Sequence, residues 1–204
     1  MSMIKMKSCI VLCGGQSRRM GRDKGSLVIG DKPMISHILS TLNNEIDEAI
    51  IVLNNQDRIE KYRKFIEKYT YSFKITFVED EIKNKGPLSG IKSGLKYTHS
   101  QYSLVLPCDS PYISKKLVNY LFSQIEGEYD CIVPYHDKDN KLQTSEPLHS
   151  IYSQNVVNKI EKLIKKDVLH IKGLIETLNC KYVEIDNKKL LKEEFKNLNR
   201  PEDI

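Results

Sequence analysis

Short apolar runs alternate with amphipathic segments along most of the chain. The apolar runs predict β-strands over residues 8–13, 48–54, 74–80, 102–109, 129–136, 147–153 and 180–185. Segments with helical spacing of apolar residues predict helices over 33–44, 56–70, 87–99, 114–126, 155–167 and 171–178. Pro33 and Pro87 stand in predicted first turns, and Ser114 is a plausible N-cap. Because continuous apolar strands alternate with helices, we expect a three-layer, doubly wound α/β fold with a mainly parallel sheet.

The chain shows no internal repeat and no low-complexity linker, so we expect one domain over residues 1–204. The alternation is regular up to residue 136 and is followed by a polar, turn-rich segment. We therefore expect residues 1–136 to form a nucleotide-binding half and residues 137–204 to form the acceptor side of a cleft. In such sheets, ligands bind beyond the carboxyl ends of the strands.

Composition narrows the class of protein. A hydrophobic fraction of 40% and a charged fraction of 29% are typical of a soluble globular protein. Neither a membrane span nor a secretory signal is predicted, so we expect a cytoplasmic protein. The net charge of +5 suits either a lysine-rich surface or a polyanionic ligand. No basic tract interleaved with aromatics occurs, so no nucleic-acid partner is expected, and the scattered cysteines predict neither disulfides nor structural zinc.

A glycine-rich, basic loop, "LCGGQSRRMGRDKG", follows the first apolar run at residues 12–25. Its glycines let backbone N–H groups turn toward an anion. The spacing matches neither a P-loop nor a dinucleotide fingerprint. An ordinary surface loop is the alternative, but Arg18, Arg19, Arg22 and Lys24 would then repel one another without gain. The loop therefore favours a nucleoside triphosphate ligand.

Two further motifs carry oxygen ligands. Asp109 ends a buried strand between Pro107 and Pro111, which restrict the loop, and such a carboxylate suits Mg²⁺. Asn197 and Asn199 are two apart, so in an extended segment both side chains would face the same side, and one of them could reach the metal or the phosphates. A turn or N-cap role for Asp109, and a turn-forming role for the asparagines, are the alternatives.

The loop at 12–25 resembles the signature loop of nucleotidyltransferases that activate sugar phosphates and cofactors. Within that superfamily, the chain most resembles the molybdenum cofactor guanylyltransferases. Three later motifs agree in type and order: "GPLSGI" (86–91), "PCDSPYI" (107–113) and "NLNRPEDI" (197–204). Cys13 departs from the Ala of many relatives but remains small, and residues 137–149 match no motif. The resemblance implies a Rossmann-like nucleotidyltransferase fold.

The resemblance also implies a reaction. Members transfer GMP from GTP to the terminal phosphate of molybdopterin and release pyrophosphate. It implies catalytic roles for Lys24, Arg19 and Asp109, and an Mg²⁺ ion held by Asp109, Asn197 and Asn199. The nucleotide-binding residues that it implies, beside Lys24 and Asp109, are Leu12, Cys13, Gly14, Gly15, Ser17, Arg18, Asn54, Asp80, Gly86, Pro87, Leu88 and Gly90.

Chemistry supports two of these roles. The Asp80 carboxylate could accept two hydrogen bonds from guanine N1 and N2, although Glu79 and Glu81 flank it. Gly86 and Gly90 would let the backbone at a helix N-terminus approach the ligand. We expect a monomer that makes transient contact with molybdoenzymes or their chaperones.

Two kinds of alternative remain. A molybdopterin cytidylyltransferase or another small-molecule nucleotidyltransferase would use the same phosphate chemistry. A non-catalytic nucleotide-binding or cofactor-delivery protein would bind the nucleotide without turning it over.

Overall fold

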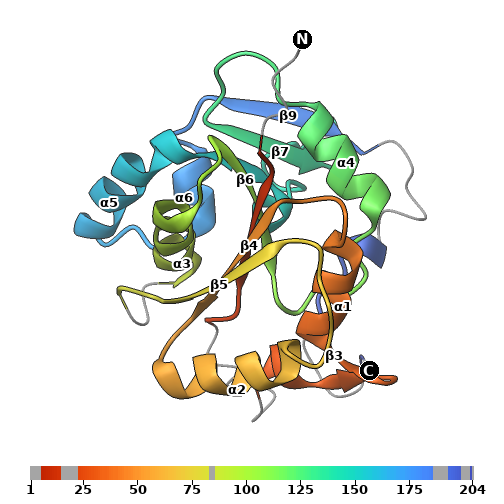
Figure 1. Ribbon diagram of the computed structural model, residues 1–204. Coiled ribbons are helices and arrows are strands. Elements are labelled where there is room, and N and C mark those ends of the chain that lie inside the picture. The colour runs from red at the N-terminus through yellow and green to blue at the C-terminus, as the bar shows by residue number, and fades with distance from the viewer. Residues whose placement is uncertain (1–5, 15–22, 83–85, 186–192, 199–202, 204) are drawn as a thin grey trace.

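The computed structural model describes residues 6–14, 23–82, 86–185, 193–198 and 203. Seven strands form one sheet in the order β5-β4-β1-β6-β8-β7-β9 (Figure 1). Their bounds are β1 Ser8–Leu12, β4 Glu48–Leu53, β5 Lys74–Glu79, β6 Tyr102–Pro107, β7 Cys131–Tyr135, β8 Ile151–Ser153 and β9 Cys180–Glu184. The pairs β5–β4, β4–β1, β1–β6 and β7–β9 are parallel, and β8 is antiparallel to both of its neighbours. The expected mainly parallel sheet is confirmed.

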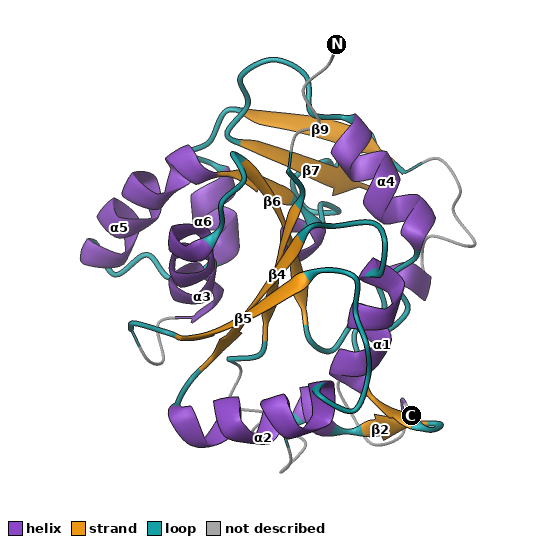
Figure 2. Ribbon diagram, viewed as in Figure 1, coloured by secondary structure: helices purple, strands orange, loops and turns teal. Residues whose placement is uncertain are grey.

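Helices cover both faces of this sheet. In Figure 2, α3, α5 and α6 lie on one side of the strands, and α1 and α4 lie on the other. The helix bounds are α1 Met34–Leu42, α2 Gln56–Ile66, α3 Gly86–Tyr97, α4 Lys115–Ser123, α5 Val157–Lys165 and α6 Ile171–Ile175, and short 3-10 turns are η1 Lys24–Ser26, η2 Pro147–His149 and η3 Gln154–Val156. Ser114 caps α4 as predicted, by accepting a hydrogen bond from the Leu117 N–H. The three-layer, doubly wound architecture is confirmed.

The sheet separates two apolar cores, because successive side chains of each strand point to opposite faces. In β1, Cys9 and Val11 pack with α1, α2 and α4, whereas Ile10 packs with α3, α5 and α6. Strand β4 divides in the same way, with Ile51 in the first core and Ile50 in the second. Because both faces are buried, these strands are continuously apolar after their first residues, Ser8 and Glu48.

Three local features differ from the sequence-based prediction. Residues 28–33 form a small antiparallel hairpin, β2 Val28–Ile29 with β3 Lys32–Pro33, which was not predicted. The strand predicted over 147–153 is divided, because Pro147 begins the 3-10 turn η2 and only Ile151–Ser153 pairs in the sheet. Pro33 lies immediately before α1 and not in its first turn.

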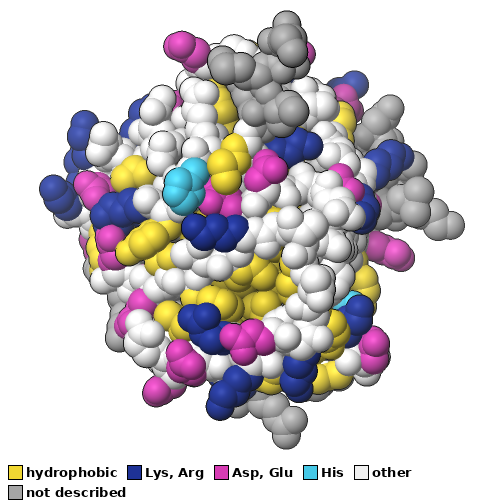
Figure 3. Space-filling view, viewed as in Figure 1, with side chains coloured by type: hydrophobic (Ala, Val, Ile, Leu, Met, Phe, Trp, Pro, Cys, Tyr) yellow, Lys and Arg dark blue, Asp and Glu magenta, His cyan; other side chains and the backbone are white. Residues whose placement is uncertain are grey.

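Strands from both parts of the chain share the sheet. Strand β7, within residues 1–136, pairs with β8 and β9, both within residues 137–204. Within the ranges that the structure describes, none of the helices combines the length and the apolar character that crossing a bilayer requires. Figure 3 shows basic and acidic side chains next to one another on one face, around an area of hydrophobic side chains. The net charge of +5 is therefore not gathered into one basic patch on that face.

Candidate functional site

The carboxyl ends of four adjacent parallel strands carry the predicted polar residues. Asp80 follows β5, Asn54 follows β4, Gly14 lies two residues after β1, and Asp109 lies two residues after β6. Since these strands are neighbours in the sheet, the four positions form a row. Three strand spacings make this row about 14 Å long. A row of that length can hold a base at one end and a triphosphate at the other.

The chain reverses its direction across the sheet between β1 and β6. After β1 it builds β4 and β5 on one side, and then returns to place β6 on the other. Such a switch point leaves a crevice in which doubly wound proteins bind their ligands. Gly14 and Asp109 flank this point, so the signature loop begins at the crevice.

Lys24 and Asp109 meet at the phosphate end of the row. The Nζ of Lys24 lies 2.8 Å from Oδ2 of Asp109, although the residues are 85 positions apart. Their side chains are 20% and 15% exposed, so water screens the pair only in part. Lys24 is positioned by η1, which it begins. The structure thus brings together two of the three predicted catalytic residues.

The C-terminal segment packs against the Asp109 loop. The Leu198 N–H donates to the Asp109 carbonyl at 2.8 Å. The Ser110 hydroxyl donates to Oδ1 of Asn197. Asn197 is therefore held beside the Asp109 loop, as a shared metal site would need. Its predicted companion, Asn199, lies outside the described residues.

The donor set at this position fits Mg²⁺. Among the described residues, no group of three His, Cys, Asp or Glu side chains could hold a metal. A single carboxylate with an amide oxygen nearby is nevertheless what Mg²⁺ uses in phosphate sites, where waters and phosphate oxygens complete the coordination. The neighbouring Lys24 ammonium would share Asp109 with the metal.

Asn54 and Gly14 are in direct contact in the middle of the row. The Nδ2 of Asn54 donates a hydrogen bond to the Gly14 carbonyl. A Cβ at Gly14 would lie only 2.7 Å from Oδ1 of Asn54, so a side chain there would displace it. Glycine at position 14 therefore lets the Asn54 amide approach the backbone, and Asn54 contacts the start of the signature loop.

The side chain of Cys13 is not available to a ligand. It is fully buried beside Cys108. Burial, followed by the neighbouring Cys108 thiol, raises the pKa of Cys13 well above its ordinary value. A neutral buried thiol is a poor nucleophile. Any contact of Cys13 with the nucleotide would have to use its backbone.

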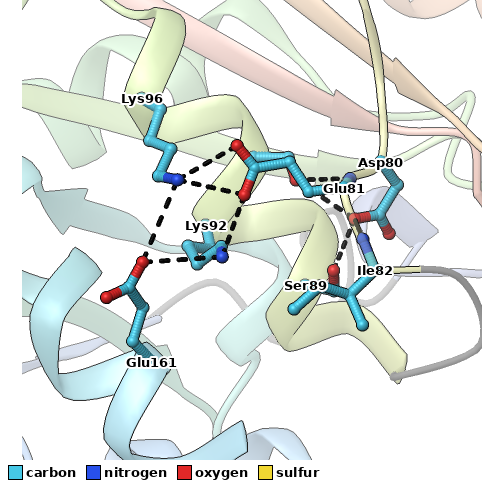
Figure 4. A network of polar contacts seen from close by, with 8 residues as sticks. Asp80, Glu81, Ile82, Ser89, Lys92, Lys96 and Glu161 are labelled. Carbon is cyan, nitrogen blue, oxygen red and sulfur yellow. Dashed lines mark hydrogen bonds and ion pairs between the residues drawn. The ribbon is translucent and has the colours of Figure 1, made fainter.

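Asp80 lies at the base end of the row and is 7% exposed. Its Oδ1 accepts hydrogen bonds from the Ser89 hydroxyl at 2.5 Å and from the Ser93 hydroxyl at 3.1 Å. The Ile82 N–H donates to the same oxygen at 3.3 Å. Figure 4 shows Asp80 beside α3, from which Ser89 projects, and Ser93 belongs to the same helix. The carboxylate is thus oriented before any ligand binds.

Backbone conformation and packing explain several residues at the start of α3. Gly86 has a φ of +67°, and a Cβ there would lie 2.9 Å from the Leu169 carbonyl oxygen. A Cβ at Gly90 would lie 3.0 Å from Cδ2 of Leu12. The Leu88 side chain is fully buried in the core, and Pro87 is half-buried. Both glycines are thus explained by conformation and packing, while approach of a ligand to this backbone stays a prediction.

Four expected residues of the signature loop lie outside the described residues: Gly15, Ser17, Arg18 and Arg19. Their roles stay predictions.

The structure adds a polar cluster that the sequence analysis missed. Arg58 of α2 donates through Nε and NH2 to both carboxylate oxygens of Asp23, at 3.1 and 2.8 Å. The Tyr62 hydroxyl donates to Oδ1 of Asp23 at 2.5 Å. Asp23 immediately precedes Lys24, so the cluster ties the end of the signature loop to α2. The acidic residue between basic ones in "GRDK" was the available signal.

A second cluster lies in the half predicted to face the acceptor. Phe195 contacts the rings of His136 and His149 edge-on, with centroids 4.9 and 5.0 Å apart. Glu146 lies 3.2 Å from Nε2 of His136 and 3.7 Å from Nδ1 of His149. Burial raises the pKa of Glu146, but the hydrogen bond with His136 and the nearby His149 ring outweigh it and lower that pKa overall. The cluster anchors the segment that leads to Asn197.

Known proteins resemble this chain in sequence and in fold. The family model for the MobA-like NTP transferase domain matches residues 9–180. A Methanothermobacter thermautotrophicus protein named "Probable molybdenum cofactor guanylyltransferase" is 35% identical over 206 residues, which cover 99% of each chain. The fold matches molybdopterin-guanine dinucleotide biosynthesis protein A from Archaeoglobus fulgidus, with a TM-score of 0.76 and 24% identity over 97% of this chain and 94% of that one.

A protein with a different nucleotide in its name shares the fold. The 4-diphosphocytidyl-2C-methyl-D-erythritol synthase of Anaerococcus prevotii gives a TM-score of 0.71 at 18% identity, over 98% of this chain and 92% of that one. The architecture alone therefore does not select the base. The family match covers most of the chain, including the four strands that carry the row and the Lys24–Asp109 pair. The chain belongs to the family of MobA-like NTP transferase domains.

Proposed function

We propose that this protein transfers GMP from GTP to the terminal phosphate of molybdopterin and releases pyrophosphate. The observation that carries the proposal is the row from Asp80 through Asn54 and Gly14 to Asp109, with Lys24 at its phosphate end. Two relatives bear the name "Probable molybdenum cofactor guanylyltransferase", and this name supplies the base and the acceptor of the proposal.

The reaction needs no protein nucleophile. An oxygen of the acceptor phosphate forms a bond to the α-phosphorus of GTP. The bond from that phosphorus to the α–β bridging oxygen breaks, and pyrophosphate leaves with the electron pair. The acceptor phosphate is already ionised at neutral pH, so the protein mainly positions the two substrates and stabilises charge.

We assign to Lys24 the stabilisation of the charge that develops on the phosphate oxygens, because it lies at the Asp109 end of the row. Fixed cations in a partly desolvated crevice stabilise such charge more strongly than water does. We assign the same task to Arg19, and we assign anion binding by the loop to Gly15, Ser17 and Arg18. When bound, Mg²⁺ would add positive charge to the triphosphate oxygens, and Asp109 with Asn197 and Asn199 would hold it.

The test measures pyrophosphate released from GTP with Mg²⁺, in the presence and absence of molybdopterin. We expect release only with molybdopterin, and a loss of about 10²–10³-fold in Asp109→Asn. Asp31→Asn is the matched control, because Asp31 is exposed in the β2–β3 turn. If the wild type binds GTP but releases no pyrophosphate with molybdopterin, the protein is a nucleotide-binding or delivery protein and not a transferase.

A further inference from the structure

One face of α3 contacts the segment that follows β5. Four residues at helical spacing, Ser89, Lys92, Ser93 and Lys96, all contact residues 80–82 (Figure 4). Side chains at positions i, i+3, i+4 and i+7 lie on one side of a helix. Three of the four, Ser89, Lys92 and Ser93, are buried, which is unusual for polar residues on a helix whose opposite side packs in the core.

The two lysines hold the backbone of this segment through Glu81. Lys92, which is only 5% exposed, places its Nζ 2.9 Å from Oε2 of Glu81 and 3.6 Å from Oε1 of Glu161. Lys96 lies 3.0 Å from the same Glu81 oxygen. Hydrogen bonds from both lysines lower the pKa of Glu81, so this carboxylate is held in its charged form. The residue next to Asp80 is thereby fixed between α3 and α5.

The two serines saturate one oxygen of Asp80. Oδ1 takes the Ser89 hydroxyl, the Ser93 hydroxyl and the Ile82 N–H, which together exceed the two lone pairs of a carboxylate oxygen. No hydrogen bond to Oδ2 is present among the described residues. Oδ2 lies 3.9 Å from the position that a Cβ would take at Gly90. The oxygen left for a ligand is therefore Oδ2, beside a position that lacks a side chain.

We propose that Ser89 and Ser93 are positioning residues. Their hydroxyls occupy Oδ1 of Asp80, so that Asp80 recognises guanine through Oδ2 alone. This inference rests on the proposed function, because it assigns the base to the Asp80 end of the row. Asp80 accepts one hydrogen bond from the guanine edge through Oδ2, and not the two from N1 and N2 that its sequence position suggests. The serine hydroxyls prevent rotation of the carboxylate and so fix the direction of that hydrogen bond.

The first test compares the wild type with Ser89→Ala, Ser93→Ala and the double variant. We expect the double variant to raise the KM for GTP about tenfold and to leave the KM for ATP unchanged, so that selectivity falls. The kcat at saturating GTP should not change, because Lys24 and Asp109 lie at the other end of the row. Ser103→Ala is the control, since Ser103 is equally buried but lies at the amino end of β6.

A loss of stability with unchanged selectivity would overturn the proposal and leave the serines a purely structural role. If the double variant does not fold, the single variants give the same comparison. A wild type without any preference for GTP over ATP would instead contradict the proposed function itself. The two failures are therefore distinguishable.

The second test counts the hydrogen bonds that Asp80 accepts. Binding of GTP, inosine triphosphate (which lacks the 2-amino group) and N1-methyl-GTP is measured by titration to the wild type and to Asp80→Asn. The titrations form double-mutant cycles between the Asp80→Asn change and each altered position of the base. If Asp80 accepts one hydrogen bond, coupling should occur at only one of the two positions, N1 or the 2-amino group. Coupling to both positions, or to neither, would overturn the proposal.

Discussion

The ammonium nitrogen of Lys24 lies 2.8 Å from Oδ2 of Asp109 and joins the end of the signature loop to the end of β6. One oxygen of the predicted metal ligand is therefore paired with a cation, which compensates the charge of this partly buried carboxylate. Binding of a triphosphate with its metal would give each of the two side chains a new partner.

Replacement of Lys24 with Met should change turnover and metal affinity in opposite directions. Turnover should fall about 10²–10³-fold, because a cation at the reacting phosphates is lost. Affinity for Mg²⁺ without nucleotide should rise, because both the competing ammonium and its repulsion of the metal are gone. Steady-state kinetics and calorimetric Mg²⁺ titration measure the two effects, with exposed Lys68→Met as the control. An unchanged Mg²⁺ affinity would mean that Asp109 does not hold the metal in the free protein.

Replacement of Arg58 with Met should destabilise the protein more than the same change at Arg63. Arg58 and Asp23 are 18% and 14% exposed, and among the described residues the variant leaves this partly buried carboxylate the Tyr62 hydroxyl as its hydrogen-bond donor. We expect a cost of about 1–3 kcal/mol in the free energy of unfolding, measured by urea denaturation. Arg63→Met, which breaks an exposed pair with Glu60, should cost less than about 1 kcal/mol. Equal costs would show that the Asp23 cluster does not fix the loop.

Gly94→Ala should destabilise the protein although alanine favours helices. The gain in helix propensity is about 1 kcal/mol. A Cβ at Gly94, however, would collide with Cγ2 of Ile10 in β1 and lie 3.0 Å from its Cδ1. Overpacking of this kind costs about 1–3 kcal/mol, so we expect a net loss in thermal denaturation. Combining it with Ile10→Ala should cost less than the sum of the single changes, and strict additivity would contradict the predicted collision.

Glu48 should contribute stability that depends on pH. Its buried carboxylate accepts hydrogen bonds from the Ser8 hydroxyl at 2.6 Å and from the His99 N–H at 2.7 Å, and its other oxygen lies 2.8 Å from the His99 ring. Burial raises the pKa of Glu48, but these hydrogen bonds outweigh it, and the pKa is lowered overall. The contribution is therefore complete above the unfolded pKa of about 4.3 and is lost as pH falls through the lower folded value.

The measurement compares wild type and Glu48→Gln by urea denaturation at several pH values between 5.5 and 3.5. We expect a difference of about 1–3 kcal/mol at pH 5.5 that shrinks as the pH falls. Glu60→Gln, at an exposed glutamate, should show little difference at any pH in this range. If the difference in free energy of unfolding between the wild type and Glu48→Gln grew toward low pH, the pKa of Glu48 would be raised in the folded protein and not lowered.

The layers of the fold could be predicted because burial on both faces of the sheet leaves a signal in the sequence. Strand β4 is apolar from Ala49 to Leu53, and the helices between the strands are amphipathic. The hairpin β2–β3 left only two paired residues in each strand, too few for a pattern, although Gly30–Asp31 is a typical hairpin turn. The antiparallel direction of β8 depends on its neighbours and not on its own three residues.

The candidate site could be predicted in its positions but not in its contacts. Asp80, Asn54 and Asp109 each follow a predicted strand, and parallel strands bring their ends together. The partner of each side chain is set by distant segments, as in the Lys24–Asp109 pair. Lys92 is the clearest example of a contact that the sequence does not predict. A lysine on a helix is ordinarily exposed, but Lys92 is buried between two glutamates.

A competition between nucleotides tests most directly whether the protein transfers GMP to molybdopterin. The protein is incubated with Mg²⁺, molybdopterin and equal concentrations of GTP, CTP, ATP and UTP, and the products are identified by mass spectrometry. Our account predicts a guanine dinucleotide of molybdopterin together with pyrophosphate. A cytosine dinucleotide as the main product, or no dinucleotide at all, would contradict it.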